Sequence, residues 1–320
     1  MVLDEGWQCL RGRPEIEALA PAWHAAAVGA GAPAIAYPAW VLAFADSHPD
    51  YARTLQLYVE YRQQQLLSVI PLMRVSTVTG RSFNTGTDST WPYFSAVLGI
   101  GGNFDELLAL LLKQAGSLEW ASLRLLDPIY RQLLAWGNRH YARCRRRRVA
   151  GEALITLTDG WDGVASQISG NLLRDMRQGD KRLRAAGAVE FAAISDAVAI
   201  AALLPEFLSL EMRGWKGDGG TAIVQTPVLL AFYNELARRA VGTELLCLYT
   251  LRVAGTLVAG ELTLRAGGRI EVLKIAYDET RAAASPGTVL RAAILRDALA
   301  TAGFDRYCLG RPSAWKSRWV

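Results

Sequence analysis

The sequence predicts an α+β protein built of two similar domains, and three observations support this fold class. The order helix, helix, strands, helix, strand occurs once before residue 150 and again after residue 187. Within each half the strands follow one another closely and are separated by short polar or glycine-containing turns, as in an antiparallel meander. The halves differ in sequence, so the repetition is one of architecture. We therefore expect domains at residues 1–158 and 188–320, joined by a basic helical segment at residues 159–187.

The elements of the first half follow from the spacing of its apolar residues. Pro38 begins a short apolar segment, as proline often does at the first position of a helix. Residues 79–90 are polar and rich in turn formers, so we expect a loop there. In chain order we expect helices at residues 12–27 and 38–44, strands at 54–61, 66–75 and 93–98, a helix at 104–114, a strand at 121–126 and a helix at 129–138.

The second half begins with the basic segment 159–187, which we expect to be one long helix. A solvated helix face is the default interpretation of its arginines and lysines, and a binding surface is the alternative. Residues 212–217 form an unusual tight turn. We then expect helices at 197–210 and 227–239, strands at 244–253, 255–265 and 269–277, a helix at 286–302 and a strand at 304–309.

Charged residues interrupt the apolar strand expected at 269–277. Because successive side chains of a strand point to opposite faces, we expect Glu271 to share a face with Tyr277, and Lys274 to lie on the other face. Ser285 is the expected N-cap of the following helix and Pro286 its first residue. Backbone N–H groups from Gly287 onward would then form an anion site. A capped helix start without a ligand is the alternative.

Composition excludes several classes of protein. Hydrophobic residues make up 51% of the 320 residues and charged residues 20%, which is typical of a globular protein and not of a disordered one. The sequence has no uncharged apolar run of eighteen residues and no apolar stretch near its start, so we expect neither a membrane span nor a signal peptide. Four scattered cysteines and three histidines predict reduced thiols, a cytoplasmic protein and no metal site. The net charge of +5 favours anionic ligands.

Short segments of the second half carry a resemblance to a known family. They are Gly214-Trp215-Lys216-Gly217, Leu273-Lys274-Ile275-Ala276-Tyr277-Asp278, Ser285-Pro286-Gly287-Thr288, Lys316-Ser317-Arg318-Trp319 and the basic Lys181-Arg182-Leu183-Arg184-Ala185-Ala186-Gly187. In these segments the chain resembles the FemAB-like, double-domain acyltransferases, and among them the BioF2-like or CelD-like acetyltransferases, of the Gcn5-related N-acetyltransferase (GNAT) superfamily. A weaker likeness in the first half rests on Ile70-Pro71-Leu72.

The resemblance implies tandem GNAT-like domains, each a mixed β-sheet meander flanked by helices, with a substrate cleft between them. It also implies acyl transfer from a thioester or an aminoacyl ester to an amine or a hydroxyl. The sequence has no GxSxG motif and no convincing nucleophilic cysteine, so we expect direct attack in a ternary complex.

The resemblance also assigns site residues. Lys274, Tyr277 and Asp278 would line the acyl donor at the end of their strand. Acyl transfer to an amine needs a base and an acid, and we expect these among Glu271, Asp278 and Tyr277. The remaining assignments are Lys274, Ser285, Gly287, Thr288 and Lys316 for the cofactor, and Asp88, Trp91, Trp215 and Lys216 for the acceptor.

Two departures from the family pattern bear on the donor. The turn at residues 282–287 has one glycine where Gcn5-type pyrophosphate loops have several, and Trp315 stands where a tyrosine is usual. We expect acyl-CoA as the donor and a small-molecule or envelope-polysaccharide acceptor. One alternative is an aminoacyl-tRNA-dependent transferase of the FemX type, with tRNA on basic residues. The other is a non-catalytic scaffold in a polysaccharide pathway.

Overall fold

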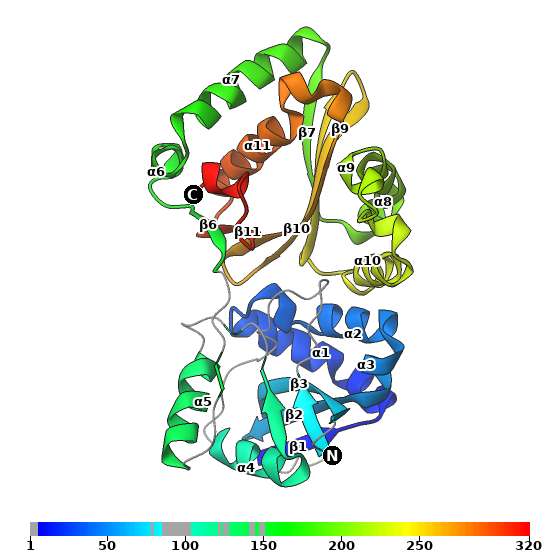
Figure 1. The fold of residues 1–320 in the computed structure, drawn as a ribbon, viewed down its shortest axis with the longest axis vertical. Helices are drawn as coiled ribbons and strands as arrows, with labels where there is room; N and C mark the ends of the chain where they lie inside the picture. The colour runs from blue at the N-terminus through cyan, green and yellow to red at the C-terminus, as the bar shows by residue number, and fades with distance from the viewer. Residues whose placement is uncertain are drawn as a thin grey trace. The chain divides into compact units, whose positions relative to one another are not determined.

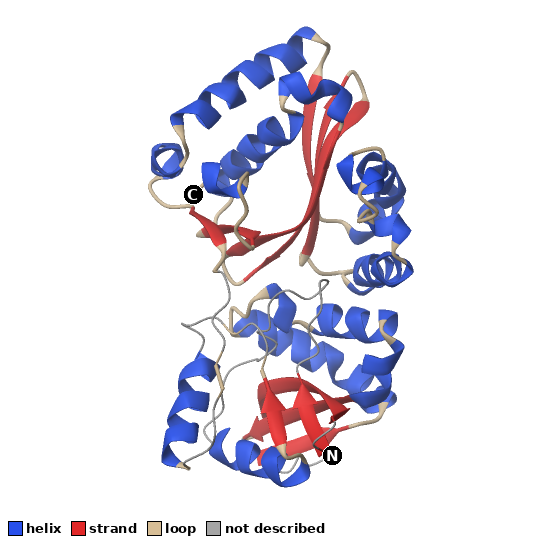
Figure 2. Cartoon of the chain, viewed as in Figure 1, coloured by secondary structure: helices blue, strands red, loops and turns tan. Residues whose placement is uncertain are grey.

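The chain forms two compact units, residues 1–149 and 150–320, each a mixed β-sheet covered by helices (Figures 1 and 2). The computed structural model describes residues 6–77, 80–84, 104–120, 123, 128–140, 145–146 and 151–320. Residues 159–187, which we expected to join the domains, lie within the second unit.

In the part of the first unit that the structure describes, five strands form a sheet in the order β1-β2-β3-β4-β5, antiparallel except for the parallel pair β4 and β5. Its core places Tyr58 and Phe83 of the sheet against Leu107 and Leu111 of α4. The elements are β1 (Gly6–Leu10), α1 (Arg13–Gly29), η1 (Ala34–Ala36), α2 (Pro38–Ser47), α3 (Pro49–Thr54), β2 (Leu55–Arg62), β3 (Gln65–Thr77), β4 (Gly80–Asn84), α4 (Phe104–Gln114), β5 (Ser117–Glu119) and α5 (Pro128–Arg139).

One expectation for this unit was wrong in position. Residues 80–84, expected within a loop, form strand β4, which pairs with β3 through contacts such as Arg74 with Phe83. Of the strand expected at 121–126 the structure describes only residue 123, and the strand expected at 93–98 lies outside the described residues. Strand β5, at Ser117–Glu119, was not expected. Phe83 is the one large apolar residue of the segment Gly80–Asn84, so the segment has no apolar alternation that a sequence pattern could reveal.

The second unit has a six-stranded sheet in the order β6-β11-β10-β9-β8-β7, in which β10 and β11 are parallel and the other pairs are antiparallel. Its elements are β6 (Ala153–Thr156), α6 (Gly160–Gln167), α7 (Gly170–Ala185), β7 (Val189–Ile194), α8 (Ala197–Met212), α9 (Trp215–Asp218), η2 (Ile223–Gln225), α10 (Pro227–Arg239), β8 (Leu246–Val253), β9 (Thr256–Ala266), β10 (Arg269–Tyr277), η3 (Glu279–Ala284), α11 (Pro286–Ala300), β11 (Arg306–Gly310) and η4 (Lys316–Arg318).

Helices cover both faces of this sheet. α6, α7 and α11 lie on one face, and α8, α9 and α10 on the other (Figure 1). Among the described residues of each unit, helices precede a three-stranded antiparallel meander, after which a helix leads to a strand parallel to the last meander strand. The predicted architectural repetition is therefore confirmed.

The segment 159–187 is two helices and not the single long helix that we expected. The break falls at Ile168 and Ser169, where Ser169 becomes the N-cap of α7 and accepts a hydrogen bond from the Leu172 N–H at 3.3 Å. The Ser169 N–H donates to the Arg318 carbonyl at 3.2 Å. A contact with the distant C-terminal segment thus stabilises the break, and helical spacing alone could not reveal it.

Candidate functional site

Strands β10 and β11 separate soon after they begin. They pair in parallel only over Arg269–Glu271 and Arg306–Cys308. Beyond Glu271, β10 continues to Tyr277 paired with β9, whereas β11 continues to Gly310 paired with β6. The second half of β10 therefore has a strand partner on one side only, which leaves backbone groups for other hydrogen bonds.

Helix α11 begins beside the end of β10. As predicted, Ser285 is its N-cap and Pro286 its first residue, although the Ser285 side chain makes no capping hydrogen bond and its φ is +47°. A Cβ built on Gly287 would lie 3.6 Å from Cδ1 of Tyr277, so the first turn of the helix packs against the Tyr277 ring. Burial raises the pKa of Tyr277, and the charge of Glu279 raises it further. The predicted donor residues Tyr277, Ser285, Gly287 and Thr288 are thus close together.

The basic helix α7 positions the turn at Ala283 and Ala284 that leads into α11. A Cβ on Gly179 would lie 2.5 Å from the Ala284 carbonyl oxygen, a distance that real structures do not allow, so α7 approaches the turn as closely as it does because residue 179 is glycine. Arg182 donates a hydrogen bond to the Ala283 carbonyl oxygen. At least part of the basic character of this helix therefore serves the fold.

The expectation that Glu271 and Tyr277 share a face was wrong. A β-bulge between Val272 and Lys274 inserts one residue and shifts the alternation of β10. Val272 and Tyr277 consequently both pack against the core that contains α11. Glu271 points to the opposite face, is 9% exposed and pairs with Arg269 at 3.2 Å.

Asp278, the other predicted carboxylate, caps η3. Its Oδ1 accepts hydrogen bonds from the Thr280 N–H at 3.0 Å and from the Thr280 hydroxyl at 2.6 Å. Its Oδ2 lies 3.4 Å from Nε of Arg281. These contacts hold the chain as it turns from β10 towards α11, so a structural role accounts for Asp278 as fully as a chemical one would.

On the other face of β10, a cluster of charged residues joins the strand to α8, α9 and α10. Lys216 Nζ donates to the Glu211 carboxylate at 2.7 Å and to the Ile275 carbonyl at 2.6 Å. The second oxygen of Glu211 accepts the Ile223 N–H at 2.9 Å. The Lys216 ammonium thus connects α8 to the part of β10 that has only β9 as a strand partner.

Lys274 extends into the same cluster. Its Nζ lies 5.7 Å from the ring centroid of Tyr233, and within the described part of the chain it forms no ion pair. Burial lowers the pKa of Lys274; the Glu211 carboxylate opposes this, and the charge of Lys216 adds to it. The sequence analysis did not identify Glu211 or Tyr233. Glu211 could have been found, because it continues the buried stripe of Ile200, Leu204 and Phe207 along α8.

A second buried polar network crosses β10 on the α11 face. Arg291 of α11 donates to the Glu261 carboxylate of β9 at 2.6 Å and to the Tyr307 hydroxyl of β11 at 3.1 Å. The Tyr307 hydroxyl donates to the other oxygen of Glu261. Burial alone would lower the pKa of Arg291, but Glu261 and Tyr307 more than offset it, so the pKa is raised. This network, too, was missed by sequence reasoning.

The C-terminal segment lies over Arg291. The rings of Trp315 and Trp319 have their centroids 5.1 and 5.0 Å from its guanidinium carbon. Lys316 Nζ donates to the Arg311 carbonyl at 2.8 Å, and burial followed by the charge of Arg291 lowers the pKa of Lys316. Lys316, which we expected to bind the cofactor, is therefore next to the buried network.

The predicted acceptor residues are only partly described. Asp88 and Trp91 lie outside the described residues. Trp215 is the first residue of α9 and Lys216 is the second. Within the described residues no group of three or more His, Cys, Asp or Glu side chains could hold a metal ion, and no helix is long and apolar enough to cross a membrane.

Comparisons with known proteins bear on the second unit and on the whole fold. Residues 170–317 match the family model described as the acetyltransferase (GNAT) domain. The structure of FemX is similar at a TM-score of 0.54 and 11% identity, covering 87% of this chain and 91% of that one. The structure of L-PGS from Bacillus licheniformis is similar at a TM-score of 0.50 and 11% identity, covering 98% of this chain and 79% of that one. No curated protein matches the sequence well enough to count as a relative.

Proposed function

We propose that this protein is an enzyme that moves an acyl group from acyl-CoA to an amine or a hydroxyl. Its residues 170–317 match the acetyltransferase (GNAT) domain, and its fold is a double-domain GNAT-like fold. The acceptor is a small molecule or a polysaccharide component. The reaction proceeds by direct attack, without a covalent enzyme intermediate.

The observation that carries this proposal is the separation of β10 from β11 beside the first turn of α11. A donor lying between the two strands can hydrogen-bond with backbone groups of β10 that have no strand partner. Its phosphates can reach the first turn of α11, where the helix dipole and the Gly287 N–H favour an anion.

The chemistry needs an acid for the departing thiolate and a base for the acceptor. In this proposal the Tyr277 hydroxyl protonates the thiolate, because Tyr277 ends β10 and packs against the helix start. Asp278 is the better placed of the two predicted carboxylates for the base, because Glu271 is buried on the opposite face and paired with Arg269. Lys274 and Lys216 lie on the α8 side, where an acceptor would approach.

Thermal unfolding with acetyl-CoA, a longer acyl-CoA and free CoA tests the donor. A ligand at one hundred times its Kd stabilises the folded state by about 2.7 kcal/mol, which raises the melting temperature measurably. Gly287→Trp should abolish the shift by filling the space beside Tyr277. Gly287→Ala, whose Cβ makes only an ordinary contact, is the matched control and should keep the shift. Absence of any shift at millimolar CoA would exclude CoA as the donor.

Turnover measurements separate the catalytic roles from donor binding. Tyr277→Phe and Asp278→Asn should each lower kcat by roughly 10²–10⁴-fold and leave the thermal shift intact. Loss of the shift together with turnover would mean that these residues only shape the site. Unchanged turnover in both variants would contradict the assigned roles.

A second candidate donor is an aminoacyl-tRNA. The exposed basic residues of α7, among them Arg174, Arg177 and Lys181, favour it, as does the single glycine of the helix start. Filter binding of an aminoacyl-tRNA, with deacylated tRNA as control, tests this donor. If neither CoA nor tRNA binds, the non-catalytic scaffold becomes the better explanation.

A further inference from the structure

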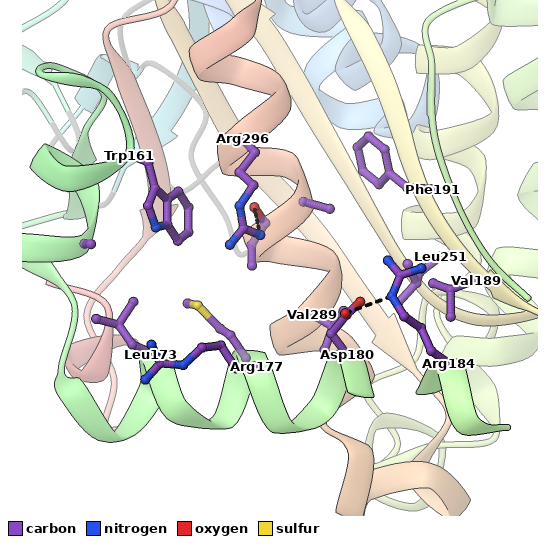
Figure 3. A pocket seen from close by; sticks show the side chains of 14 residues that line it. Trp161, Leu173, Arg177, Asp180, Arg184, Val189, Phe191, Leu251, Val289 and Arg296 are labelled. Atoms are coloured by element: carbon purple, nitrogen blue, oxygen red, sulfur yellow. Dashed lines mark hydrogen bonds and ion pairs between the residues drawn. The ribbon is translucent and has the colours of Figure 1, made fainter. Parts of the chain in front are cut away.

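The second unit contains a cavity of about 600 Å³ that the proposed reaction does not use (Figure 3). It lies between α6, α7 and α11 and is closed on its remaining side by residues of β7 and β8. In the sheet order, β9 and β10 lie between β8 and β11. The cavity is therefore distinct from the place where β10 and β11 separate. Its volume is within the range of about 300–1,000 Å³ that is usual for small-molecule sites.

The interior of the cavity is apolar. Ten of its fourteen lining residues are apolar, and most of these are aliphatic, including Leu173, Met176, Val189, Leu251 and Val289. The remaining four are three arginines and one aspartate, so the indole N–H of Trp161 is the single neutral hydrogen-bonding group among the lining side chains. A polar ligand such as a sugar or a nucleotide would leave its hydrogen bonds unmade there, whereas a hydrocarbon chain loses none.

The charge of the lining is positive and lies at the mouth. Arg177, Arg184 and Arg296 are exposed, whereas the apolar lining residues are buried or half-buried. Asp180 pairs with Arg184 at 2.9 Å, which leaves Arg177 and Arg296 without a carboxylate partner among the described residues.

Stacking fixes one of these two arginines. The Arg296 guanidinium lies over the ring of Trp161, with its carbon 4.0 Å from the ring centroid. Figure 3 shows this pair across the cavity from α7, which carries Arg177. Arg296 Nη1 also donates to the Ala292 carbonyl at 3.5 Å. A guanidinium held over an indole ring keeps its remaining edge N–H groups available for an anion.

We propose that this cavity binds a single-chain amphiphile with an anionic head group, such as a long-chain carboxylate. The hydrocarbon chain occupies the aliphatic interior, where its burial provides the driving force. The head group contacts Arg177 and Arg296 at the mouth through charge-assisted hydrogen bonds. This site is separate from the proposed donor site, although α11 contributes to both.

Calorimetric titration of the intact protein with laurate, below its micellar concentration, tests the proposal. We expect saturable binding of one laurate per chain. Acetate, which has the charge without the chain, and dodecyl maltoside, which has the chain without the charge, should bind much more weakly. Saturating CoA should leave laurate binding unchanged, because the two sites differ.

Variants of the lining sharpen the test. Removing both free charges with Arg177→Gln and Arg296→Gln should weaken laurate binding about tenfold or more. Ala293→Trp, which fills the cavity, should abolish it. Arg174→Gln is the matched control, because Arg174 is an exposed arginine of the same helix that does not line the cavity, and it should bind as the wild type does. Unchanged melting temperatures without ligand would show that the variants fold.

Four results would overturn the proposal. They are unchanged laurate binding in Ala293→Trp, equal affinity for dodecyl maltoside and laurate, displacement of laurate by CoA, and binding to phosphatidylglycerol vesicles without binding to laurate. The third would make the cavity part of the donor site, and the fourth would indicate a membrane-binding surface in its place. Because laurate binding is measured without turnover, its failure leaves the proposed acyl transfer untouched.

Discussion

At the scale of single residues, the most costly contact to lose is the buried network of Arg291, Glu261 and Tyr307. Arg291 and Glu261 are 4% and 1% exposed. A buried ion pair gains little net stability over apolar residues, but loss of one partner leaves an uncompensated charge in the interior. The network connects α11 to strands on both sides of β10, so it also positions the helix whose start borders the candidate donor site.

Glu261→Gln should therefore lower the free energy of unfolding by about 3–5 kcal/mol, because it leaves the Arg291 guanidinium buried without a counter-charge. Urea unfolding measures this. Glu206→Gln is the control: it removes an equivalent charge from the exposed pair with Arg252, and should cost less than about 1 kcal/mol. Similar losses in the two variants would contradict the special role of the network.

Lys274 presents the opposite case, a half-buried cation without an ion-pair partner among the described residues. Its pKa is lower in the folded protein than the ordinary value of 10.5 because burial disfavours the charged form. Between the folded and the unfolded pKa the unfolded chain binds more protons, so the contribution of Lys274 to stability improves as pH rises through that range.

Lys274→Met should consequently be more stable than the wild type near pH 7, and the difference should shrink as the pH approaches 10. Urea unfolding of both proteins at several pH values tests this prediction. Lys181→Met, which removes an exposed lysine of α7, should show no such narrowing. A stability difference between Lys274→Met and the wild type that stays constant with pH would mean that burial does not disfavour the charged form of Lys274.

At the scale of elements, helix α7 and the bulge in β10 determine the geometry around the candidate site. The bulge places Tyr277 on the α11 face. The close approach of α7 at Gly179 fixes the turn that leads into α11. Neither feature contains a reacting group, yet both decide where the expected reacting groups lie.

Gly179→Leu should displace the turn at Ala284, cost about 1–3 kcal/mol of stability and weaken CoA binding by shifting the start of α11. Gly170→Leu, at the start of the same helix, is the control because a Cβ there meets no atom within 4 Å. Thermal unfolding with and without CoA measures both effects. A Gly179→Leu protein with wild-type stability would contradict the close packing.

At the scale of the whole molecule, the two units have separate hydrophobic cores. One is built around Tyr58, Phe83 and α4, and the other around β8, β9, α7 and α11. A unit with its own core and sheet can fold alone. The predicted donor residues all lie in the second unit.

We therefore expect residues 150–320, produced alone, to unfold in one cooperative transition and to retain the CoA-induced thermal shift of the full chain. Urea unfolding monitored by tryptophan fluorescence measures the cooperativity of the transition, and thermal unfolding with CoA measures the shift. A non-cooperative transition would show that the first unit is needed for stability. A cooperative fragment that fails to bind CoA would show that the first unit contributes to the donor site.

The sequence by itself determined the elements that local patterns specify. Residues with clear periodicity, such as those of α4 and α10, and strands bounded by turns, such as β8, β9 and β10, were predicted within a few residues. Pro286 predicted the start of α11, because proline fits the first turn of a helix and not its interior. These signals depend on neighbours along the chain, so one sequence is enough to reveal them.

Only the tertiary structure decided the features that join distant segments. The short strands β6 and β7 form by pairing with residues far away in the chain, and the break at Ser169 likewise depends on a distant contact. The bulge moved Glu271 to the opposite face from Tyr277, because one inserted residue reverses the alternation. The Arg291 network and the apolar cavity likewise depend on several elements at once. Long-range packing therefore decided which predicted residues lie together.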